Sequence, residues 1–201
     1  MKKKSGRETE IKLRVQNLAA IRRRLRALGL QPIHRRAFED NLLYDTTDHA
    51  LRNARSILRL RQHGSRWTLT YKGPPSPDPH FKSRPEWETA VSHPATLRSL
   101  FAALGLAPVF RYQKYRTLYA PGGAGRTSRA GGEVCLDETP IGNFLELEGS
   151  RAWIDRMVRR LGYSRADHET ASYATLYQRA CQQSGRKPGN MVFAAGRKPK
   201  K

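Results

Sequence analysis

Acidic and basic side chains alternate along the first strand-like stretch of this sequence. Glu8, Glu10, Lys12 and Arg14 occupy every second position there, with uncharged residues between them. Side chains at i, i+2 and i+4 of a β-strand share one face, so these charged groups would lie together. Carboxylates suit hard divalent cations such as Mg²⁺ or Mn²⁺, and Lys and Arg suit phosphoryl oxygens. The stretch therefore predicts a surface that holds a metal ion beside a phosphate.

Charged residues return at alternate positions in the later strand-like stretches. They are Arg59, Arg61, Lys72, Arg84, Glu86, Glu88, Lys114, Arg116, Asp137, Glu146 and Glu148. For any single strand, a face open to water is the simpler explanation. These faces, however, put Glu beside Glu and Arg beside Arg, which is repulsive unless something neutralises the charge. We therefore expect the charged faces to line one shared cavity that takes a metal ion and a triphosphate.

Glu10 and Lys12 are the predicted catalytic residues of this cavity. Lys12 could help to orient an attacking water, and simple binding of phosphate explains it equally well. Filled with metal and substrate, the cavity would stabilise a transition state of phosphoryl transfer by position and electrostatics.

An internal repeat indicates how the charged stretches are arranged. Residues 27–30 read Ala-Leu-Gly-Leu, and the same four residues return at 103–106. Each copy ends a predicted helix: Leu18, Ile21, Leu25 and Leu28 share one helical face in the first half, and Leu97, Leu100, Phe101 and Leu104 share one in the second. In the first helix Asn17 is placed as the N-cap, and Gly29 is placed just after the end. The two halves are therefore expected to have the same order of elements.

Each half is predicted to hold four strands, because three strand-like runs follow each helix and one precedes it. The runs that follow the helices are 36–45, 56–62, 66–72, 110–119, 133–138 and 143–149. Eight strands suffice to close a barrel of small bore, which would give the charged faces a common interior. We predict an α+β fold: an eight-stranded antiparallel β-barrel, or tunnel, built from two repeated halves, with helices packed outside.

The rest of the chain divides into loops, closing helices and tails. Two breaker-rich segments, 73–83 and 121–132, are predicted as mobile surface loops, and helices are predicted over 150–161 and 170–183. The expected organisation is a basic N-terminal extension over 1–7, the tunnel domain over 8–184, and a disordered basic tail over 185–201. Deletion of 186–201 is expected to leave turnover intact.

The net charge and the cysteines limit the class of protein. The chain has 38 Lys and Arg against 17 Asp and Glu, a formal charge of +21, so an anionic partner is expected. Two cysteines give no disulfide framework, and no apolar run suits a signal peptide or a membrane helix, which predicts a soluble cytoplasmic protein without a membrane partner. A non-catalytic RNA-binding protein is the alternative from another class, with the basic tail touching nucleic acid. It would have no need of acids beside its bases.

The order of the motifs resembles the CYTH superfamily, also called the triphosphate tunnel metalloenzymes. The resemblance begins at Glu8-Thr9-Glu10-Ile11-Lys12 and covers about residues 8–180. It continues through Tyr44-Asp45-Thr46, Leu58-Arg59-Leu60-Arg61, Leu69-Thr70-Tyr71-Lys72-Gly73, Arg84 to Glu88, Lys114 to Arg116, Leu136-Asp137, Phe144 to Glu148 and Ser172-Tyr173. Each motif is weak alone, and their order makes the match specific.

The resemblance implies an eight-stranded antiparallel tunnel that works with Mg²⁺ or Mn²⁺. By resemblance, Glu8, Glu10 and Glu148 would hold the metal, with Glu146 and Asp137 assisting. The triphosphate would be held by Lys12, Arg59, Arg61, Lys72, Lys114 and Arg116. The alternation of charges adds Arg14 and Arg84 to the substrate-binding set.

The same grip serves two reactions in the family. In a triphosphatase, water attacks the terminal phosphorus; in a class IV adenylyl cyclase, the ribose 3′ hydroxyl attacks the α phosphorus of ATP and pyrophosphate leaves. We expect a triphosphatase acting on tripolyphosphate, thiamine triphosphate or ATP, with the cyclase as the alternative, in a monomer or a homodimer. Tyr44, Trp67, Phe81 and Tyr112 could stack on a substrate ring, although packing explains most of them better.

Overall fold

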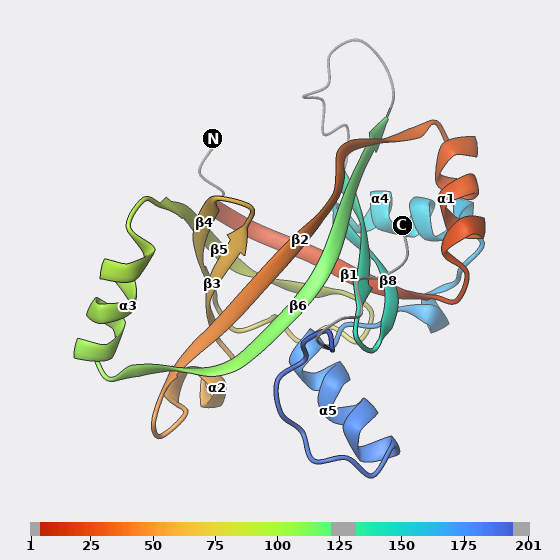
Figure 1. The fold of residues 1–201 in the computed structure, drawn as a ribbon. Coiled ribbons are helices and arrows are strands. Elements are labelled where there is room, and N and C mark those ends of the chain that lie inside the picture. The colour runs from red at the N-terminus through yellow and green to blue at the C-terminus, as the bar shows by residue number, and fades with distance from the viewer. Residues whose placement is uncertain (1–4, 122–131, 195–201) are drawn as a thin grey trace.

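Eight antiparallel strands close into one barrel in the computed structural model, which describes residues 5–121 and 132–194 (Figure 1). Around the barrel the strands follow the order β1-β5-β4-β3-β2-β6-β7-β8. Their bounds are β1 Ser5–Val15, β2 Leu30–Thr46, β3 Ile57–His63, β4 Arg66–Lys72, β5 Lys82–Val91, β6 Leu106–Pro121, β7 Gly132–Thr139 and β8 Gly142–Gly149. The predicted α+β class and the eight-stranded antiparallel barrel are confirmed.

The two predicted halves of the barrel exchange their first strands. β1 pairs with β8 of the other half, and β5 pairs with β4 of the other half, while β1 and β5 also pair with each other. On the opposite side β2 pairs with β6. Every strand therefore has two neighbours, and the charged faces of both halves meet in one interior.

The helices lie outside the barrel, as predicted, and are short (Figure 1). They are α1 Leu18–Ala27, α2 Ala50–Asn53, α3 Pro94–Ala103, α4 Arg151–Arg160 and α5 Tyr173–Gln183, with a 3₁₀ turn at Arg165–Asp167. The Asn17 side chain caps α1 by accepting from the backbone N–H of Ala20 at 2.9 Å, and Gly29 follows the helix with a φ of 76°. Both signals were predicted. No helix in the described ranges has the length and hydropathy needed to cross a bilayer.

The main hydrophobic core lies between the barrel wall and helices α1 and α4. Ile21 and Leu25 of α1 and Ile154 of α4 pack in one cluster with Ile11 and Leu13 of β1. The outward apolar faces of the strands thus meet apolar helix faces, which leaves the charged faces directed inward. Burial of these aliphatic side chains, each about 1.5–3 kcal/mol, offsets part of the cost of the charged interior.

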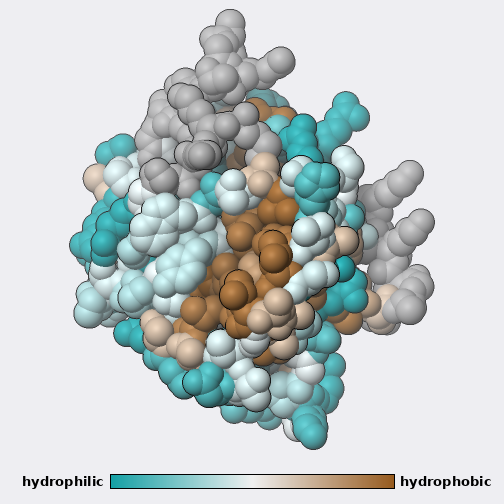
Figure 2. Space-filling model, turned by 90° about the vertical axis from the view of Figure 1, so that its left-hand side faces the viewer, coloured by the Kyte–Doolittle hydropathy of each residue, from teal (hydrophilic) through white to brown (hydrophobic). Residues whose placement is uncertain are grey.

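Helix α3 covers its part of the wall less completely than expected. Phe101 is buried and its ring contacts that of Tyr44, with centroids 4.8 Å apart. Leu100 and Leu104, predicted to pack inward, stay 55% and 72% exposed. Figure 2, which faces this side of the molecule, shows apolar surface there. The first half gives the reason, because β4 is followed by a loop where β8 is followed by the covering helix α4.

β2 and β6 are much longer than predicted, at 17 and 16 residues. They pair with each other from Leu30 opposite Pro121 to Thr46 opposite Leu106. Pro32 and Pro108 were interpreted as helix exits, because proline cannot donate to a ladder. Both lie within strands here, next to shifts in the register, where proline is tolerated.

The segment 73–83, predicted as a mobile loop, is packed against the barrel. Phe81 is buried in the main core, and β5 already begins at Lys82. Asp78 accepts from the backbone N–H groups of His80 and Phe81, both at 2.9 Å, and pairs with Arg151 at 2.7 Å. Of the glycine-rich loop 121–132, Pro121 and Gly132 belong to strands and residues 122–131 lie outside the described residues.

Both predicted tail boundaries need correction. The N-terminal extension was placed at 1–7, but β1 starts at Ser5, opposite Trp87; residues 1–4 lie outside the described residues. The tail was predicted to be disordered from 185, yet Met191 is fully buried beside β6. Met191 N donates to the carbonyl of Arg111 at 3.0 Å, and the Met191 carbonyl accepts from Gln113 N at 2.9 Å. The basic composition concealed one short apolar run, Met191–Phe193.

This docking predicts that the chain cannot be shortened from 186 without loss of stability. Met191→Ala should lower the free energy of unfolding by about 2–5 kcal/mol, the usual cost of truncating a buried methionine. Urea denaturation of the variant and of two truncations, lacking 186–201 and 195–201, measures the effect. The shorter truncation is the control and should match the full chain. If loss of 186–201 leaves the unfolding curve unchanged, Met191 contributes nothing and the original expectation was right.

Candidate active site

The barrel encloses a cavity of about 200 Å³ whose wall is mostly charged. All eight strands and the start of α5 contribute to it. Its charged lining residues are Glu10, Lys12, Arg59, Arg61, Lys72, Lys82, Arg84, Glu86, Glu88, Lys114, Arg116, Glu133, Glu146 and Glu148. The shared cavity expected from the alternation of charges is therefore present, and we call it the lumen.

Lys12 lies between two carboxylates on neighbouring strands. Its Nζ is 3.2 Å from Glu10 and 3.1 Å from Glu146, which stands directly opposite it on β8. Burial alone would lower the pKa of Lys12, but Glu10 and Glu146 outweigh it and raise the pKa above its usual value. Lys12 is thus held as a cation, suited to binding or orienting an oxygen and unsuited to accepting a proton.

Two arginines on β3 are fixed by uncharged and acidic partners. Arg59 donates to Tyr112 Oη at 3.3 Å and to Thr70 Oγ1 at 3.1 Å. Arg61 donates to Glu88 Oε2 at 3.1 Å, and the same oxygen accepts from Thr70 at 3.0 Å. The guanidinium groups are therefore held in position before any ligand arrives, so less side-chain entropy would be lost on binding.

Asp137 lies within the wall and anchors the bases around it. It is fully buried and accepts from Lys114 Nζ at 2.9 Å, from Arg116 Nε and Nη2 at 2.7 and 2.6 Å, and from Tyr173 Oη at 2.7 Å. It does not line the lumen. The prediction that Asp137 helps to hold a metal does not fit this geometry, because its oxygens already serve three donors. It is a positioning residue for Lys114 and Arg116.

Glu8 and Glu10 crowd a corner of the barrel with other acids. The Glu8 carboxylate forms a short ion pair with Lys72 and lies 3.8 Å from Arg84 Nε. Burial, and after it the charge of Glu10, raises the pKa of Glu8 to about 8. Burial would also raise the pKa of Glu10, but Lys12, Lys82, Lys72 and Arg84 hold it well below the usual range. A carboxyl group that resists ionisation next to an ionised one favours the arrival of a cation.

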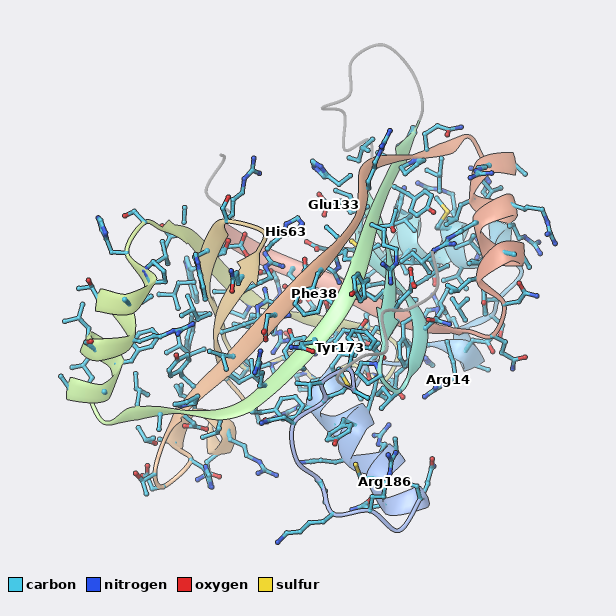
Figure 3. All side chains as sticks on the ribbon, in the orientation of Figure 1. Arg14, Phe38, His63, Glu133, Tyr173 and Arg186 are labelled. Atoms are coloured by element: carbon cyan, nitrogen blue, oxygen red, sulfur yellow. The ribbon has the colours of Figure 1, made fainter. Side chains whose placement is uncertain are left out.

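A row of three glutamates crosses β1, β8 and β7. Glu10 is directly opposite Glu148, and Glu148 is directly opposite Glu133. Like charges opposite one another destabilise a sheet unless they are neutralised. Glu133, labelled in Figure 3, was missed from the sequence although it shares a strand face with Asp137, which was found.

The carboxylates fit a divalent cation in chemistry, because carboxylate oxygens are the ligands that Mg²⁺ and Mn²⁺ prefer. Within residues 5–121 and 132–194, however, no three acidic, histidine or cysteine side chains are gathered around one point as ligands. The acids are turned toward lysines: Glu10 lies 3.2 Å from Lys82, and Glu8 pairs with Lys72. These lysines neutralise the same carboxylates that a cation would neutralise, so the residues fit the ion in type and in charge.

The structure separates Arg14 from the lumen. Its side chain is exposed, its guanidinium lies over the Phe144 ring at 4.9 Å, and Nη1 donates to the carbonyl of Ile141 at 3.4 Å. Figure 3 shows it away from the centre of the barrel. Arg14 has the same strand face as Lys12, but it lies one pair further along β1, opposite the buried Phe144. The substrate-binding role predicted for Arg14 does not fit this position.

Sequence reasoning missed Glu39 and Lys82. Glu39 lies 3.6 Å from Lys114 and 3.8 Å from Arg61; burial would raise its pKa, but Lys114, Arg116, Arg61 and Arg59 lower it to about 2. Lys82 was assigned to a loop, although it alternates with Arg84 and so shares its face. Burial, the largest influence, lowers the pKa of Lys82 to about 8.

Of the four aromatic residues considered for stacking, only Tyr112 lines the lumen. Tyr44 and Trp67 pack in the cluster beneath α3, and Phe81 packs in the main core. Packing was the favoured explanation for most of them, and it holds for these three.

Comparison with known proteins agrees with this geometry. The sequence profile of the CYTH domain matches residues 6–173. A curated protein of Methanocaldococcus jannaschii, provisionally named an adenylate cyclase, is 28% identical over 144 residues, which cover 71% of this chain and 77% of the relative.

Solved structures share the fold. One from Vibrio parahaemolyticus, provisionally described as an adenylate cyclase, has a TM-score of 0.74 at 19% identity over 87% of this chain and 99% of its own. A Pyrococcus horikoshii protein has a TM-score of 0.71 at 23% identity, over 86% and 99% of the two chains. A Hippeastrum protein described as an adenylyl cyclase with dominant triphosphatase activity has a TM-score of 0.59 at 18% identity, over 90% and 97%.

Proposed function

Because this chain belongs to the CYTH domain family, we propose that its lumen is the active site of a metal-dependent enzyme that hydrolyses a triphosphate. One observation carries the proposal: fixed arginines and lysines and a set of crowded carboxylates face the same closed cavity. The bases complement phosphoryl oxygens, and the acids complement a hard cation. A triphosphate with its metal would neutralise both sets at once.

The residues of the lumen would act mainly by holding the substrate in place. Arg59 and Arg61 on one wall, and Lys114 and Arg116 on another, would bind the phosphoryl oxygens. Their partners Thr70, Glu88 and Asp137 keep them directed, so little reorganisation is needed as charge develops. Lys72 and Arg84 would bind oxygens at the end where Glu8 lies.

We place Mg²⁺ or Mn²⁺ at Glu8, Glu10 and Glu148, with Glu146 nearby. When bound, such an ion supplies charge neutralisation and an acidified water. The contribution of Lys12 is to hold an oxygen of the substrate or of that water as a hydrogen-bond donor, since its two acidic neighbours keep it charged. Glu146 keeps Lys12 directed into the lumen when Glu10 turns to the ion.

Cyclisation of ATP is the second candidate reaction, because the same grip would serve it and several relatives are provisionally named adenylate cyclases. We favour hydrolysis, as a protein of this fold described as an adenylyl cyclase has dominant triphosphatase activity. A non-catalytic RNA-binding role has less support, because the bases of the lumen are paired with acids inside a tunnel. Two free, buried cysteines suit the cytoplasm as the compartment.

An activity assay with a matched pair of arginine variants tests the proposal. The protein is incubated with tripolyphosphate, thiamine triphosphate or ATP and with Mg²⁺ or Mn²⁺, and phosphate is measured against pyrophosphate and cyclic AMP. Arg61→Ala should lower kcat/KM by about 100-fold or more, the scale set by loss of one preorganised electrostatic group. Arg14→Ala, outside the lumen, should keep full activity. No turnover of any of the three substrates would overturn the proposed function, and equal losses in both variants would show that Arg14 belongs to the site.

A further inference from the structure

A second cavity, of about 640 Å³, adjoins the lumen at the end where α5 begins. The two cavities share six lining residues, Leu43, Ile57, Lys82, Arg84, Ser172 and Ala174. We call the second cavity the vestibule. A ligand held by its phosphates in the lumen could therefore extend into the vestibule without leaving the protein.

Size separates the roles of the two cavities. Pockets for small organic ligands span roughly 300–1,000 Å³. The lumen, at about 200 Å³, falls below that range and the vestibule falls within it. The lumen suits a chain of phosphates, and any ring system attached to that chain needs the larger space outside.

An aromatic track connects the cavities along the inner face of β6. Tyr112 lines the lumen, and its ring is stacked with that of Phe110, with centroids 6.0 Å apart and planes 23° apart. The Tyr177 ring of α5 is 6.0 Å beyond Phe110, and both line the vestibule. Phe110 and Tyr177 are only half-buried. Exposed aromatic faces at this position suit a planar ring stacked against them.

The segment after α5 forms another wall of the vestibule. Pro188, Gly189 and Asn190 line it, and the docking of Met191 on β6 holds them there. Asn190 Oδ1 accepts from Arg111 N at 2.8 Å, which directs the amide and leaves its NH₂ group as a donor. Tyr177 and this segment lie beyond residue 173, where the family match ends, so this wall belongs to this chain and not to the shared domain.

The charges of the vestibule discriminate between rings. Among the described residues that line it, Asp45 is the one acid. Asp45 Oδ1 accepts from the backbone of Thr46 and Leu51 and Oδ2 from that of Arg52, at 2.8–2.9 Å. Basic residues, Arg52 and Arg55 among them, surround the space. A cationic thiazolium would meet no available counter-charge, whereas a neutral base with polar edges would not need one.

We infer that the substrate is a nucleoside triphosphate, with its base stacked on Phe110 and Tyr177 in the vestibule and its phosphates in the lumen. This rests on the proposed function and restricts it, since tripolyphosphate would leave the vestibule empty and thiamine triphosphate would place a cation in it. The part of the chain after residue 173 then determines the choice of substrate.

Steady-state kinetics of Tyr177→Ala with ATP and with tripolyphosphate tests the inference. KM for ATP should rise by about tenfold, the effect of losing one base–aromatic stack, and KM for tripolyphosphate should not change. Tyr177→Phe keeps the ring and should restore the wild-type KM for ATP. Phe193→Ala is the matched control, since its ring packs on Tyr115 away from the vestibule.

The outcomes separate the inference from the function on which it rests. If the wild-type protein hydrolyses tripolyphosphate but Tyr177→Ala shifts both KM values equally, or neither, the base does not bind there. A wild-type kcat/KM higher for thiamine triphosphate than for ATP would overturn the inference as well. Photolabelling of the wild-type protein with 8-azido-ATP does not depend on any variant. The label is expected within residues 173–194, and a label confined to other peptides would contradict the assignment.

Discussion

Glu10→Gln is expected to lower turnover of the preferred triphosphate by about 10²–10³-fold, the range found when one preorganised charged contact is removed. Glu10 is buried, directly opposite Glu148 and within 3.2 Å of both Lys12 and Lys82. It is thus the carboxylate best placed both to hold a cation and to direct Lys12. Glutamine keeps the shape and removes the charge, so the loss should appear in kcat and in the affinity for Mn²⁺.

Mn²⁺ binding followed by electron paramagnetic resonance separates these two effects. The variant should bind Mn²⁺ about 10–100-fold more weakly, as when the support of a metal site is damaged. Glu138→Gln is the control: Glu138 is also a buried, ion-paired glutamate, but it faces Arg22 and Arg36 outside the lumen. It should keep its Mn²⁺ affinity. Wild-type Mn²⁺ affinity in Glu10→Gln would remove Glu10 from the proposed ligands.

The face on which a charge lies could be predicted from the sequence, because the period of a strand is local. Lys12, Arg61 and Glu148 all reach the lumen as their alternation required. The repeat likewise predicted two equivalent helices, since Asn17 and Gly29 act within one turn of the helix ends that they define. Closure of the barrel followed from the number of strands.

Depth along the barrel could not be predicted, because it depends on register between distant strands. Arg14 and Lys12 share a face, yet only the pairing of β1 with β8 puts Arg14 beside Phe144 and past the end of the lumen. Nor does alternation tell a residue that opens into the cavity from one enclosed in its wall, which is the case of Asp137. Met191 shows a third limit: a short apolar run in a basic tail gains its meaning only from the groove on β6 that receives it.

Asp137→Ala is expected to cause the largest loss of stability of any single change in the wall. The variant would leave Lys114, which is 2% exposed, and Arg116 without the carboxylate that they share. Removing one partner of a buried ion pair costs about 3–5 kcal/mol, because the remaining charge stays buried. Glu39 and Glu146 lie 3.6 and 3.9 Å from Lys114 and would take up part of its charge, which places the expected loss toward the lower end. Arg116 would also lose its fixed direction, so activity should fall in the fraction that stays folded.

Urea denaturation of three variants resolves the contributions at this position. Tyr173→Phe removes one hydrogen bond to the carboxylate and should cost about 1.5–3 kcal/mol, the range for bonds to charged groups. Asp155→Asn breaks a surface pair with the exposed Arg165 and should leave the unfolding midpoint unchanged. The order Asp137→Ala, then Tyr173→Phe, then Asp155→Asn follows from burial and from the number of donors served. If Asp137→Ala unfolds at the urea concentration of Asp155→Asn, the bases of the lumen do not depend on Asp137, and their rigidity must come from Glu39 and Glu146 instead.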